Sequence, residues 1–452
     1  MTIQPESSKV LIIGAGAFGV STAYHLLKRG FSDVTVVERS ETVPAPDAAS
    51  NDYNRIVRTS YSDRFYSELT KKAIGLWKDG EVYGDSYHES GVVILTDDAN
   101  PDSDAARYSG LAYENDQAIG ARLHTLDSEV DSTTASSSRI STQLFAPKTN
   151  VNPAIYAKGT RNYVNLDGGW ANAQKGVEML SQEVVRLGGR LVVGKRAKNL
   201  IRNEHGKTIG VRCEDAVSGD TDILEGDVVV LALGAWTNST FPELNLTGSC
   251  LATGQFVAMI QLTEEETLKY SGVPVVLDLA TGFYVFPPTR EGIFKVALHG
   301  RGRTVTNAAG ISAPRTIVSD GKEGLRIPKS VLPEFRSFLR RVYPDLADRP
   351  FLRSRLCWYN DTPDENFIIG KCPGDDGLVV ASGDSGHAYK LLPVLGEIVA
   401  DAVMDQLCPA LARRFAVGRG TPPEGAHSRP TGGSSEELDI TNLCTEDDLT
   451  LD

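Results

Sequence analysis

Residues 9–38 read KVLIIGAGAFGVSTAYHLLKRGFSDVTVVE, and this stretch decides the fold class of the chain. It opens with a short apolar, β-branched run that is typical of a buried parallel strand. A helix is predicted from Val20 to Arg29, with Gly30 as its stop, and a second strand covers residues 34–38. A strand, a helix and a strand within about 30 residues form a βαβ unit, which predicts an α/β protein with a parallel sheet.

The turn inside this unit carries the motif Gly14-x-Gly16-x-x-Gly19, which is typical of dinucleotide binding. Gly14 permits the tight turn, Gly16 lets backbone N–H groups approach a pyrophosphate, and Gly19 lets the helix pack closely. The positive end of the helix dipole then faces the phosphates. Glu38, 24 residues after Gly14, is placed to accept hydrogen bonds from a ribose. Because the motif follows a strand and opens a helix, we predict a Rossmann-like domain and not merely a glycine-rich turn.

A second strand bears on the choice between NAD and FAD, which the first motif leaves open. Residues 227–234 read DVVVLALG, a buried strand that runs into a turn at Gly234. Such a strand, placed roughly 200 residues downstream, suits an FAD that lies extended across the sheet. Taken alone, a core strand with a glycine stop explains this segment equally well.

Changes in composition along the chain predict three regions. Segments rich in turn formers and mixed polar residues are interpreted as an inserted α+β substrate domain that carries a mixed antiparallel sheet. The last region, rich in Gly, Pro, Ser and Thr and then in acidic residues, is interpreted as disordered. The expected bounds are 1–84, 166–238 and 355–415 for the discontinuous FAD-binding domain, 85–165 and 239–354 for the substrate domain, and 418–452 for the disordered acidic tail.

Composition excludes several classes of protein. The net charge of −13, from 46 Lys and Arg against 59 Asp and Glu, argues against a nucleic-acid partner, which needs clustered cations. No run of 18 apolar residues is present, so no membrane partner is expected. The six cysteines show no CxxC spacing, which excludes a disulfide scaffold and a zinc ribbon, and no metal site is expected. The N-terminal residues do not form a signal peptide, and the C-terminus lacks a Ser-Lys-Leu-type ending; we expect an intracellular protein, cytoplasmic or peroxisomal.

The chain resembles the monomeric sarcosine oxidase and fructosyl amino acid oxidase (amadoriase) family of FAD-dependent amine oxidases. The segments that carry the resemblance are Gly14–Glu38, Asn51–Arg58 (NDYNRIVR), Gly292–Lys295 (GIFK) and Cys357–Lys390. The most specific part is RLCWYNDTPDENFII at 355–369 together with SGDSGHAYK at 382–390, which is nearer to the fungal amadoriase-like branch. These segments span almost the whole chain in the family's order, and the resemblance implies an enzyme that works as a monomer.

The resemblance implies roles for individual side chains. Cys357 is expected to hold FAD covalently, as a thioether to the flavin 8α-methyl group, and its thiolate needs an electropositive site; outside this motif it would be interpreted as an inert thiol. Lys295 is expected to activate O₂ as a fixed cation beside the flavin; otherwise it would be a strand lysine whose head reaches solvent. Arg58 and Lys390 are expected to bind the carboxylate of an amino-acid substrate.

The complete expected site combines these residues with their motif neighbours. The catalytic residues are Lys295, His299 and Arg55. The substrate-binding residues are Arg58, Lys390 and Tyr284. The cofactor-binding residues are Gly14, Ala15, Gly16, Phe18, Gly19, Glu38, Arg39, Ser50, Asn51, Arg55, Gly234, Trp236, Cys357, Asp384, Ser385, Gly386, His387 and Lys390.

The implied reaction is the oxidation of the C–N bond of a secondary, N-substituted or N-methyl amino acid to an imine, with O₂ reduced to H₂O₂. The imine would hydrolyse, or would cyclise in a fungal biosynthetic pathway. Residue 55 is arginine where amadoriases usually have lysine, and no Asp-Glu-Phe follows Lys295, which argues against glycated substrates. A deglycating fructosyl amino acid oxidase, an oxidase of the sarcosine, pipecolate or saccharopine type, and a flavin dehydrogenase with another electron acceptor stay open as alternatives.

Overall fold

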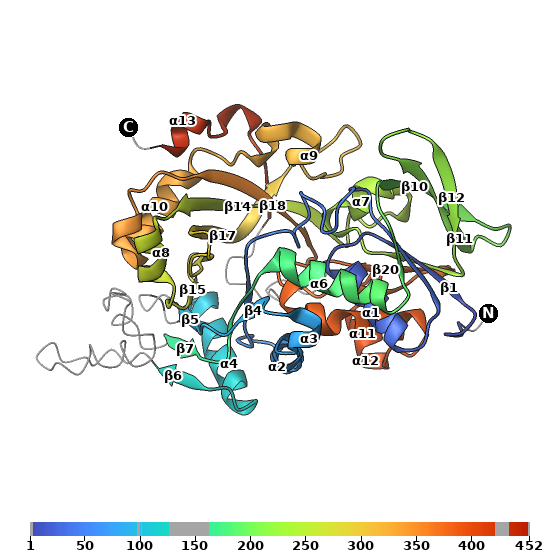
Figure 1. Cartoon of the computed structure of the whole chain (residues 1–452), viewed down its shortest axis with the longest axis horizontal. Helices are drawn as coiled ribbons and strands as arrows, with labels where there is room; N and C mark the ends of the chain where they lie inside the picture. The colour runs from blue at the N-terminus through green and yellow to red at the C-terminus, as the bar shows by residue number, and fades with distance from the viewer. Residues whose placement is uncertain (1–2, 97–99, 101, 126–161, 421–433, 451–452) are drawn as a thin grey trace, which may run out of the picture.

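The computed structural model describes residues 3–96, 100, 102–125, 162–420 and 434–450, which are drawn as the coloured ribbon in Figure 1. Two large sheets organise this part of the chain, one of six strands and one of nine. In Figure 1 the first sheet lies on the side of the N-terminus and the second extends toward the opposite end of the molecule.

The six-stranded sheet is built around the first strand of the βαβ unit. Its strands, in spatial order, are β19 (Ile368–Cys372), β20 (Asp375–Ser382), β13 (Val228–Leu231), β1 (Lys9–Ile13), β2 (Asp33–Val37) and β9 (Arg190–Val192). Neighbouring strands pair in parallel, except that β19 pairs antiparallel with β20 at the edge. The expected α/β class is therefore confirmed.

Helices cover one face of this sheet, and a small antiparallel sheet covers the other. The helices are α1 (Ala17–Lys28), α6 (Ala173–Arg186) and α11 (Leu392–Val403), and the small sheet consists of β10 (Lys195–Arg202), β11 (Thr208–Asp215) and β12 (Thr221–Glu225). Along β1, Val10 and Ile12 belong to the core under the helices, whereas Leu11 and Ile13 pack on the small sheet. Burial on both faces explains why β1 is apolar throughout.

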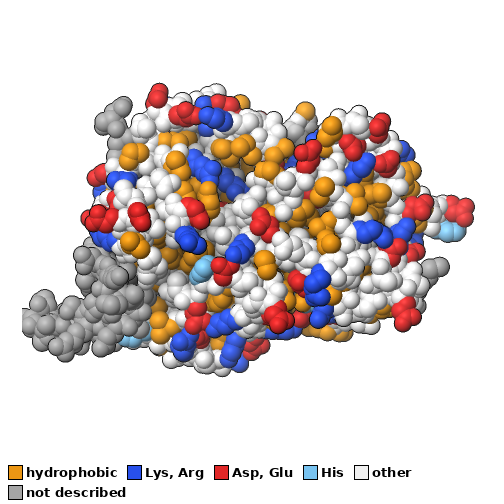
Figure 2. Space-filling model, in the orientation of Figure 1, with side chains coloured by type: hydrophobic (Ala, Val, Ile, Leu, Met, Phe, Trp, Pro, Cys, Tyr) orange, Lys and Arg blue, Asp and Glu red, His pale blue; other side chains and the backbone are white. Residues whose placement is uncertain are grey.

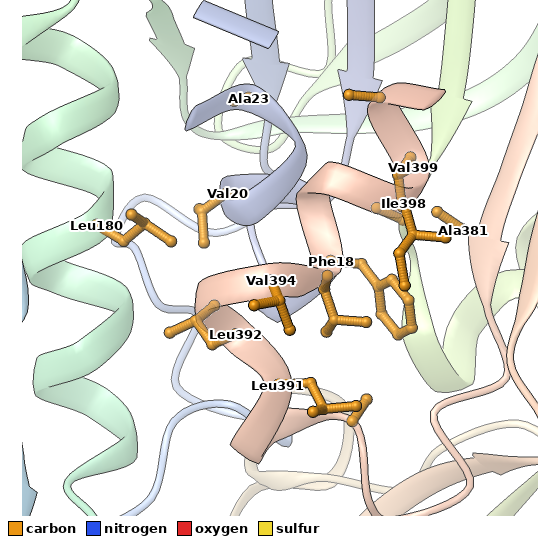
Figure 3. Close-up of a cluster of buried hydrophobic side chains, with 14 of the residues drawn as sticks. Phe18, Val20, Ala23, Leu180, Ala381, Leu391, Leu392, Val394, Ile398 and Val399 are labelled. Atoms are coloured by element: carbon orange, nitrogen blue, oxygen red, sulfur yellow. The ribbon is translucent and has the colours of Figure 1, made fainter. Parts of the chain in front are cut away.

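The three helices interlock through small and branched side chains. Figure 3 shows Val20 and Ala23 of α1 close to Leu180 of α6 and Val394 of α11. The helix α1 begins three residues before its expected start, because the N–H of Val20 already donates to the carbonyl of Gly16 at 3.0 Å.

The nine-stranded sheet forms the second large part of the fold. Its strands, in spatial order, are β18 (Arg353–Asp361), β14 (Leu251–Gln261), β17 (Ile293–Thr304), β16 (Phe283–Val285), β15 (Val275–Asp278), β5 (Val92–Leu95), β7 (Tyr163–Asn165) and β6 (Leu123–Thr125), and β21 (Glu436–Glu437) pairs with β17. Most pairs are antiparallel, but β5 pairs with β15 and β17 pairs with β21 in parallel, so the sheet is mixed as expected. The expected domain boundary at residue 355 is wrong, because it falls inside β18, whose whole length pairs with β14.

Shorter elements connect the two large sheets. A third small sheet joins β3 (Arg55–Val57), β8 (Gly169–Ala171) and β4 (Tyr87–His88). The remaining α-helices with described bounds are α2 (Arg64–Trp77), α3 (Gly80–Tyr83), α4 (Asp104–Ala118), α7 (Thr237–Thr240), α8 (Glu264–Tyr270), α9 (Ile317–Asp320), α10 (Val331–Val342), α12 (Pro409–Arg414) and α13 (Glu446–Leu449).

The expectation of a disordered tail is wrong for residues 434–450. There β21 pairs with the end of β17, and Leu438, Leu443 and Leu449 are buried in the same core as α10. The low average hydrophobicity of the tail was misleading, because a few well-spaced apolar side chains are enough to anchor it. Of the predicted tail, residues 421–433 and 451–452 lie outside the described residues.

Positive and negative side chains are interspersed over the face shown in Figure 2, with hydrophobic side chains scattered between them. Among the helices that the structure describes, none has the length and apolar character needed to cross a membrane.

Candidate active site

A large cavity of about 420 Å³ opens at the carboxyl ends of β1, β2 and β13. Gly14 and Gly16 line it after β1, Glu38 after β2, and Gly234 and Trp236 after β13. The carboxyl ends of parallel strands are where open α/β sheets bind ligands. The two strands that the sequence singled out as separate motifs therefore meet at one cavity.

The glycine turn is sterically required at two positions. Gly14 has φ +103°, and a Cβ there would lie 2.4 Å from the carbonyl oxygen of Ala232. At Gly19 a Cβ would lie 1.8 Å from the carbonyl oxygen of Gly14. A side chain at either position would push α1 away from the sheet or close the turn.

Glu38 ties the end of β2 to the glycine turn. Its Oε2 accepts from the N–H of Ala15 at 3.0 Å, and its Oε1 accepts from the N–H of Ser40 at 3.0 Å. The carboxylate is thereby fixed at the cavity wall, where each oxygen has further lone pairs for ribose hydroxyls. Because the N–H of Ala15 donates to this carboxylate, Ala15 holds Glu38 in place and does not itself line the cavity.

The structure brings most of the expected cofactor residues together. Those that line the large cavity are Gly14, Gly16, Phe18, Glu38, Arg39, Ser50, Arg55, Gly234, Trp236, Asp384 and Gly386. The others lie elsewhere: Ala15 and Gly19 sit behind the turn, Asn51 lines a separate cavity of about 220 Å³, Cys357 and Ser385 are buried in the wall, and His387 and Lys390 line a third cavity.

Sequence reasoning missed a basic side of the large cavity. Lys195, Arg196 and Lys198 of β10 line it together with the glycine turn. The run KRAK at 195–198 was the available signal, but it follows no recognised motif.

The third cavity, of about 110 Å³, adjoins the first and shares Arg55, Tyr359, Gly386 and Tyr389 with it. Its lining includes the three expected substrate-binding residues, Arg58, Tyr284 and Lys390, together with His299, which was expected to be catalytic. These side chains come from segments far apart in the sequence, so only the fold assembles this cavity.

Arg58 is a buried cation with unused hydrogen-bonding capacity. Its Nη2 donates to the hydroxyl of Tyr108 at 3.4 Å, while its Nη1 has no partner among the described residues. Burial alone would lower its pKa, but the neighbouring Tyr108 and Tyr61 hydroxyls outweigh burial and raise the pKa above its ordinary value. A buried charge with an unsatisfied donor is costly, and an anionic ligand would relieve that cost.

Lys295 is fully buried, which excludes the alternative of a strand lysine that reaches solvent. Its Nζ donates to Asp52 Oδ2 at 3.0 Å and to the carbonyl of Asn54 at 2.7 Å. Burial lowers its pKa to about 7, although Asp52 opposes that shift. For Asp52, burial would raise the pKa, but the charges of Arg55, Lys295 and Arg355 together lower it.

Arg55 connects the large cavity with the thiol of Cys357. Its Nη1 forms an ion pair with Asp52, and its Nη2 donates to Cys357 Sγ at 3.0 Å. Cys357 lies on β18 and is 2% exposed. The Arg55 guanidinium thereby places a positive charge directly beside the sulfur atom that would form the covalent bond.

The residues around the large cavity fit FAD. At Gly14 and Gly16 the backbone faces the cavity without side chains. Glu38 lines the cavity at the end of β2, and the guanidinium of Arg39 lies 4.2 Å from the centroid of the Trp236 ring. Backbone N–H groups in such a turn suit a pyrophosphate. The cavity also reaches Arg55, and through it the thiol.

The chain belongs to the family described as FAD dependent oxidoreductase, whose sequence model matches residues 9–402. L-saccharopine oxidase of Schizosaccharomyces pombe is 31% identical over 411 residues, which cover 89% of this chain and 91% of the relative. The amino acid oxidase imqH of Aspergillus flavus is 28% identical and covers 88% and 93% of the two chains. Peroxisomal sarcosine oxidase of Mus musculus is 26% identical and covers 92% and 98%.

Solved structures of amadoriases share the fold. Fructosyl peptide oxidase from E. terrenum has a TM-score of 0.82 with 24% identity and covers 98% of both chains. Fructosamine oxidase (Amadoriase II) from Aspergillus fumigatus has a TM-score of 0.79 with 24% identity and covers 98% of this chain and 97% of that chain. The expected family resemblance and the expected fold are both confirmed, and the protein is an FAD-dependent oxidoreductase.

Proposed function

We propose that the protein is an oxidase that converts the CH–NH bond of a secondary amino acid into an imine and reduces O₂ to H₂O₂. One observation carries the proposal: the buried Arg58, with its unpartnered Nη1, and Lys390 line a small cavity that adjoins the cavity for FAD. Two cations from different directions suit the carboxylate of an amino acid. The relatives named L-saccharopine oxidase and peroxisomal sarcosine oxidase support a secondary amine as the oxidised group.

The residues around the large cavity would hold the cofactor. The turn at Gly14 and Gly16 would bind the pyrophosphate, Glu38 the ribose, and Cys357 the flavin through a thioether. Bound FAD supplies the acceptor for the hydride that leaves the carbon next to the substrate nitrogen. The protein's own contribution is to orient that carbon, by holding the carboxylate, and to keep water out of a small buried cavity.

The substrate nitrogen must be neutral to lose a hydride from its neighbouring carbon, so we expect this half-reaction to become faster as pH rises through the pKa of the bound amine. Tyr284 and His299 form the wall of the small cavity and would contact the substrate. The imine product would then hydrolyse, or would cyclise where the substrate carries a second nucleophile.

Lys295 would serve the half-reaction with O₂. A fixed ammonium stabilises the negative charge that develops when O₂ accepts an electron. Its hydrogen bonds to Asp52 and Asn54 hold the ammonium in place without solvent, which keeps the charge effective.

A substrate panel tests the proposed function. N-methyl, cyclic and glycated amino acids are compared with their carboxamides, and H₂O₂ release is measured. We expect peroxide from one or more secondary amino acids and little from the carboxamides. The variant Arg58→Ala should raise KM for the active carboxylate by about 100-fold, whereas the exposed Arg107→Ala should not. Flavin bleaching without peroxide would indicate a dehydrogenase, and peroxide from carboxamides at equal rates would reject the carboxylate site.

A further inference from the structure

Tyr61 contacts both cations of the small cavity. The guanidinium carbon of Arg58 lies 4.8 Å from the centroid of the Tyr61 ring, and Lys390 Nζ donates to the Tyr61 hydroxyl at 2.8 Å. The tyrosine is 5% exposed and follows Arg58 by three residues, whereas Lys390 is 329 residues away in the sequence. One aromatic side chain therefore sets the distance between two cations that come from opposite ends of the chain.

The hydrogen bonds beyond Tyr61 have a defined direction. His387 Nε2 lies 2.8 Å from the carbonyl oxygen of Glu365, and a carbonyl oxygen only accepts, so Nε2 carries a proton. Nδ1 of the same ring, in this tautomer, accepts from the Tyr61 hydroxyl at 3.0 Å. The ammonium of Lys390 only donates, so the order is Lys390 to Tyr61 to His387.

The imidazole ring of His387, the last group in this series of hydrogen bonds, is held in place by its neighbours. Its ring stacks on Phe367 at 4.8 Å between centroids and meets the edge of Tyr66 at 4.9 Å. Both ring nitrogens are engaged by Tyr61 and Glu365, which stops the ring from turning. The imidazole therefore supports Tyr61 mechanically, in addition to any contact with the cofactor.

We propose that Tyr61, held by His387, is a positioning residue that fixes Lys390 and Arg58 at the spacing of one carboxylate. This inference rests on the proposed function, because it concerns how the carboxylate is selected. The Tyr61 ring packs against the Arg58 guanidinium in a cation–π contact, and the Tyr61 hydroxyl accepts a hydrogen bond from Lys390 at the cavity wall. Without the hydroxyl, the ammonium keeps its hydrogen bond to the carbonyl of His387 at 3.0 Å but loses the bond that ties it to Tyr61, so the spacing of the two cations is less well fixed.

The test uses the holoenzyme and a ligand that cannot be oxidised as an amine. N-acetylglycine is titrated against N-acetylglycinamide, which differs only in the carboxylate, and dissociation constants are measured from the change in the flavin absorption spectrum. We expect Tyr61→Phe to raise the dissociation constant of N-acetylglycine by about tenfold, as for the loss of one hydrogen bond to a charged group. The dissociation constant of N-acetylglycinamide should not change. With the oxidised substrate, KM should rise by a similar factor while kcat stays within about twofold.

Tyr66→Phe is the matched control, because it removes a neighbouring buried hydroxyl that donates to Asn366 and lines neither cavity. It should leave both dissociation constants unchanged. Equal binding of N-acetylglycine to Tyr61→Phe and to the wild type would overturn the inference. If Arg58→Ala and Lys390→Gln also bound it as tightly as the wild type, the carboxylate site itself, and with it the proposed function, would be wrong. If Arg58→Ala and Lys390→Gln weakened the binding of N-acetylglycine but Tyr61→Phe did not, only the positioning role of Tyr61 would be rejected.

Discussion

At the scale of single residues, the charges beside the cavity form one buried group of Arg55, Lys295 and Asp52. Asp52 accepts from both cations, and its own pKa is lowered by them against the effect of burial. Burial is the main cause that lowers the pKa of Lys295 to about 7; Asp52 acts against this shift, and the charge of Arg55 acts with it. Arg55 keeps its charge because its pKa is raised, with Asp52 outweighing burial.

This charge balance predicts the pH dependence of the reaction with O₂. A lowered pKa means that the ammonium of Lys295 is present below about pH 7 and is lost as pH rises through that value. The rate of flavin reoxidation, measured by stopped flow after anaerobic reduction, should therefore fall as pH rises through about 7. In Lys295→Met it should be about 100-fold slower at low pH and independent of pH in this range.

The anaerobic half-reaction is the control for Lys295→Met. Reduction of the flavin by substrate should be slowed much less than reoxidation, because Lys295 does not line the small cavity proposed for the substrate, whereas its charge is proposed to act on O₂. Equal losses in both half-reactions would contradict a specific role toward O₂.

The thiol of Cys357 yields a second prediction at this scale. If it carries the flavin, acid-precipitated wild-type protein stays yellow, whereas Cys357→Ser releases its flavin into the supernatant. Cys213→Ser is the control, since that thiol is buried in a different core and its pKa is raised by burial to about 11. Colour retained by precipitated Cys357→Ser would show that another residue forms the bond, and colour released by the precipitated wild type would show that the flavin is not covalently held.

At the scale of elements, α1 and α11 approach each other unusually closely. Ser21 of α1 donates its hydroxyl to the carbonyl of Leu392 at 2.6 Å and accepts from the N–H of Gly396 at 2.8 Å. A Cβ at Gly396 would lie 1.9 Å from the carbonyl oxygen of Ser21. This contact sets the place of α1, and α1 in turn carries the glycine turn of the FAD cavity.

Gly396→Ala should therefore destabilise the protein. The added methyl group forces two packed helices apart, which costs about 1–3 kcal/mol. Gly75→Ala in α2, where nothing lies within 4 Å of the added carbon, should instead stabilise by about 0.5–1 kcal/mol. Thermal unfolding of both variants measures the difference, and a Tm of Gly396→Ala at or above that of Gly75→Ala would refute the close contact.

At the scale of the whole molecule, the last described segment, residues 434–450, joins the core of the nine-stranded sheet. Figure 1 shows it running along the top of the molecule beside α9. Its acidic side chains pair with cations of that region, Glu436 with Arg303 at 3.0 Å and Glu446 with Lys322 at 3.0 Å. These pairs are exposed and contribute little to stability, so the buried leucines provide the attachment.

Leucine truncation tests this attachment. Leu443 is 6% exposed, and its replacement by alanine should lower the free energy of unfolding by about 2–5 kcal/mol. Ile440 in the same segment is 62% exposed, and its replacement by alanine should change the unfolding free energy by less than about 0.5 kcal/mol. Equal effects in denaturant titrations would mean that the segment is not held by its buried side chains.

The sequence by itself determined the βαβ unit, the glycine turn and Glu38. Strand periodicity and the turn geometry at Gly14 are local properties, so they are legible without the fold. The motif resemblance also predicted that Cys357, Lys295, Arg58 and Lys390 serve one site.

Only the tertiary structure decided what surrounds those residues. Asp52 lies 243 positions from Lys295, and Tyr61 lies 329 positions from Lys390, yet each pair is in hydrogen-bond contact. The strand that carries Cys357 joined the second sheet, and the acidic tail joined its core. Burial and electrostatic partners depend on which distant segments pack together, and local composition does not encode that choice.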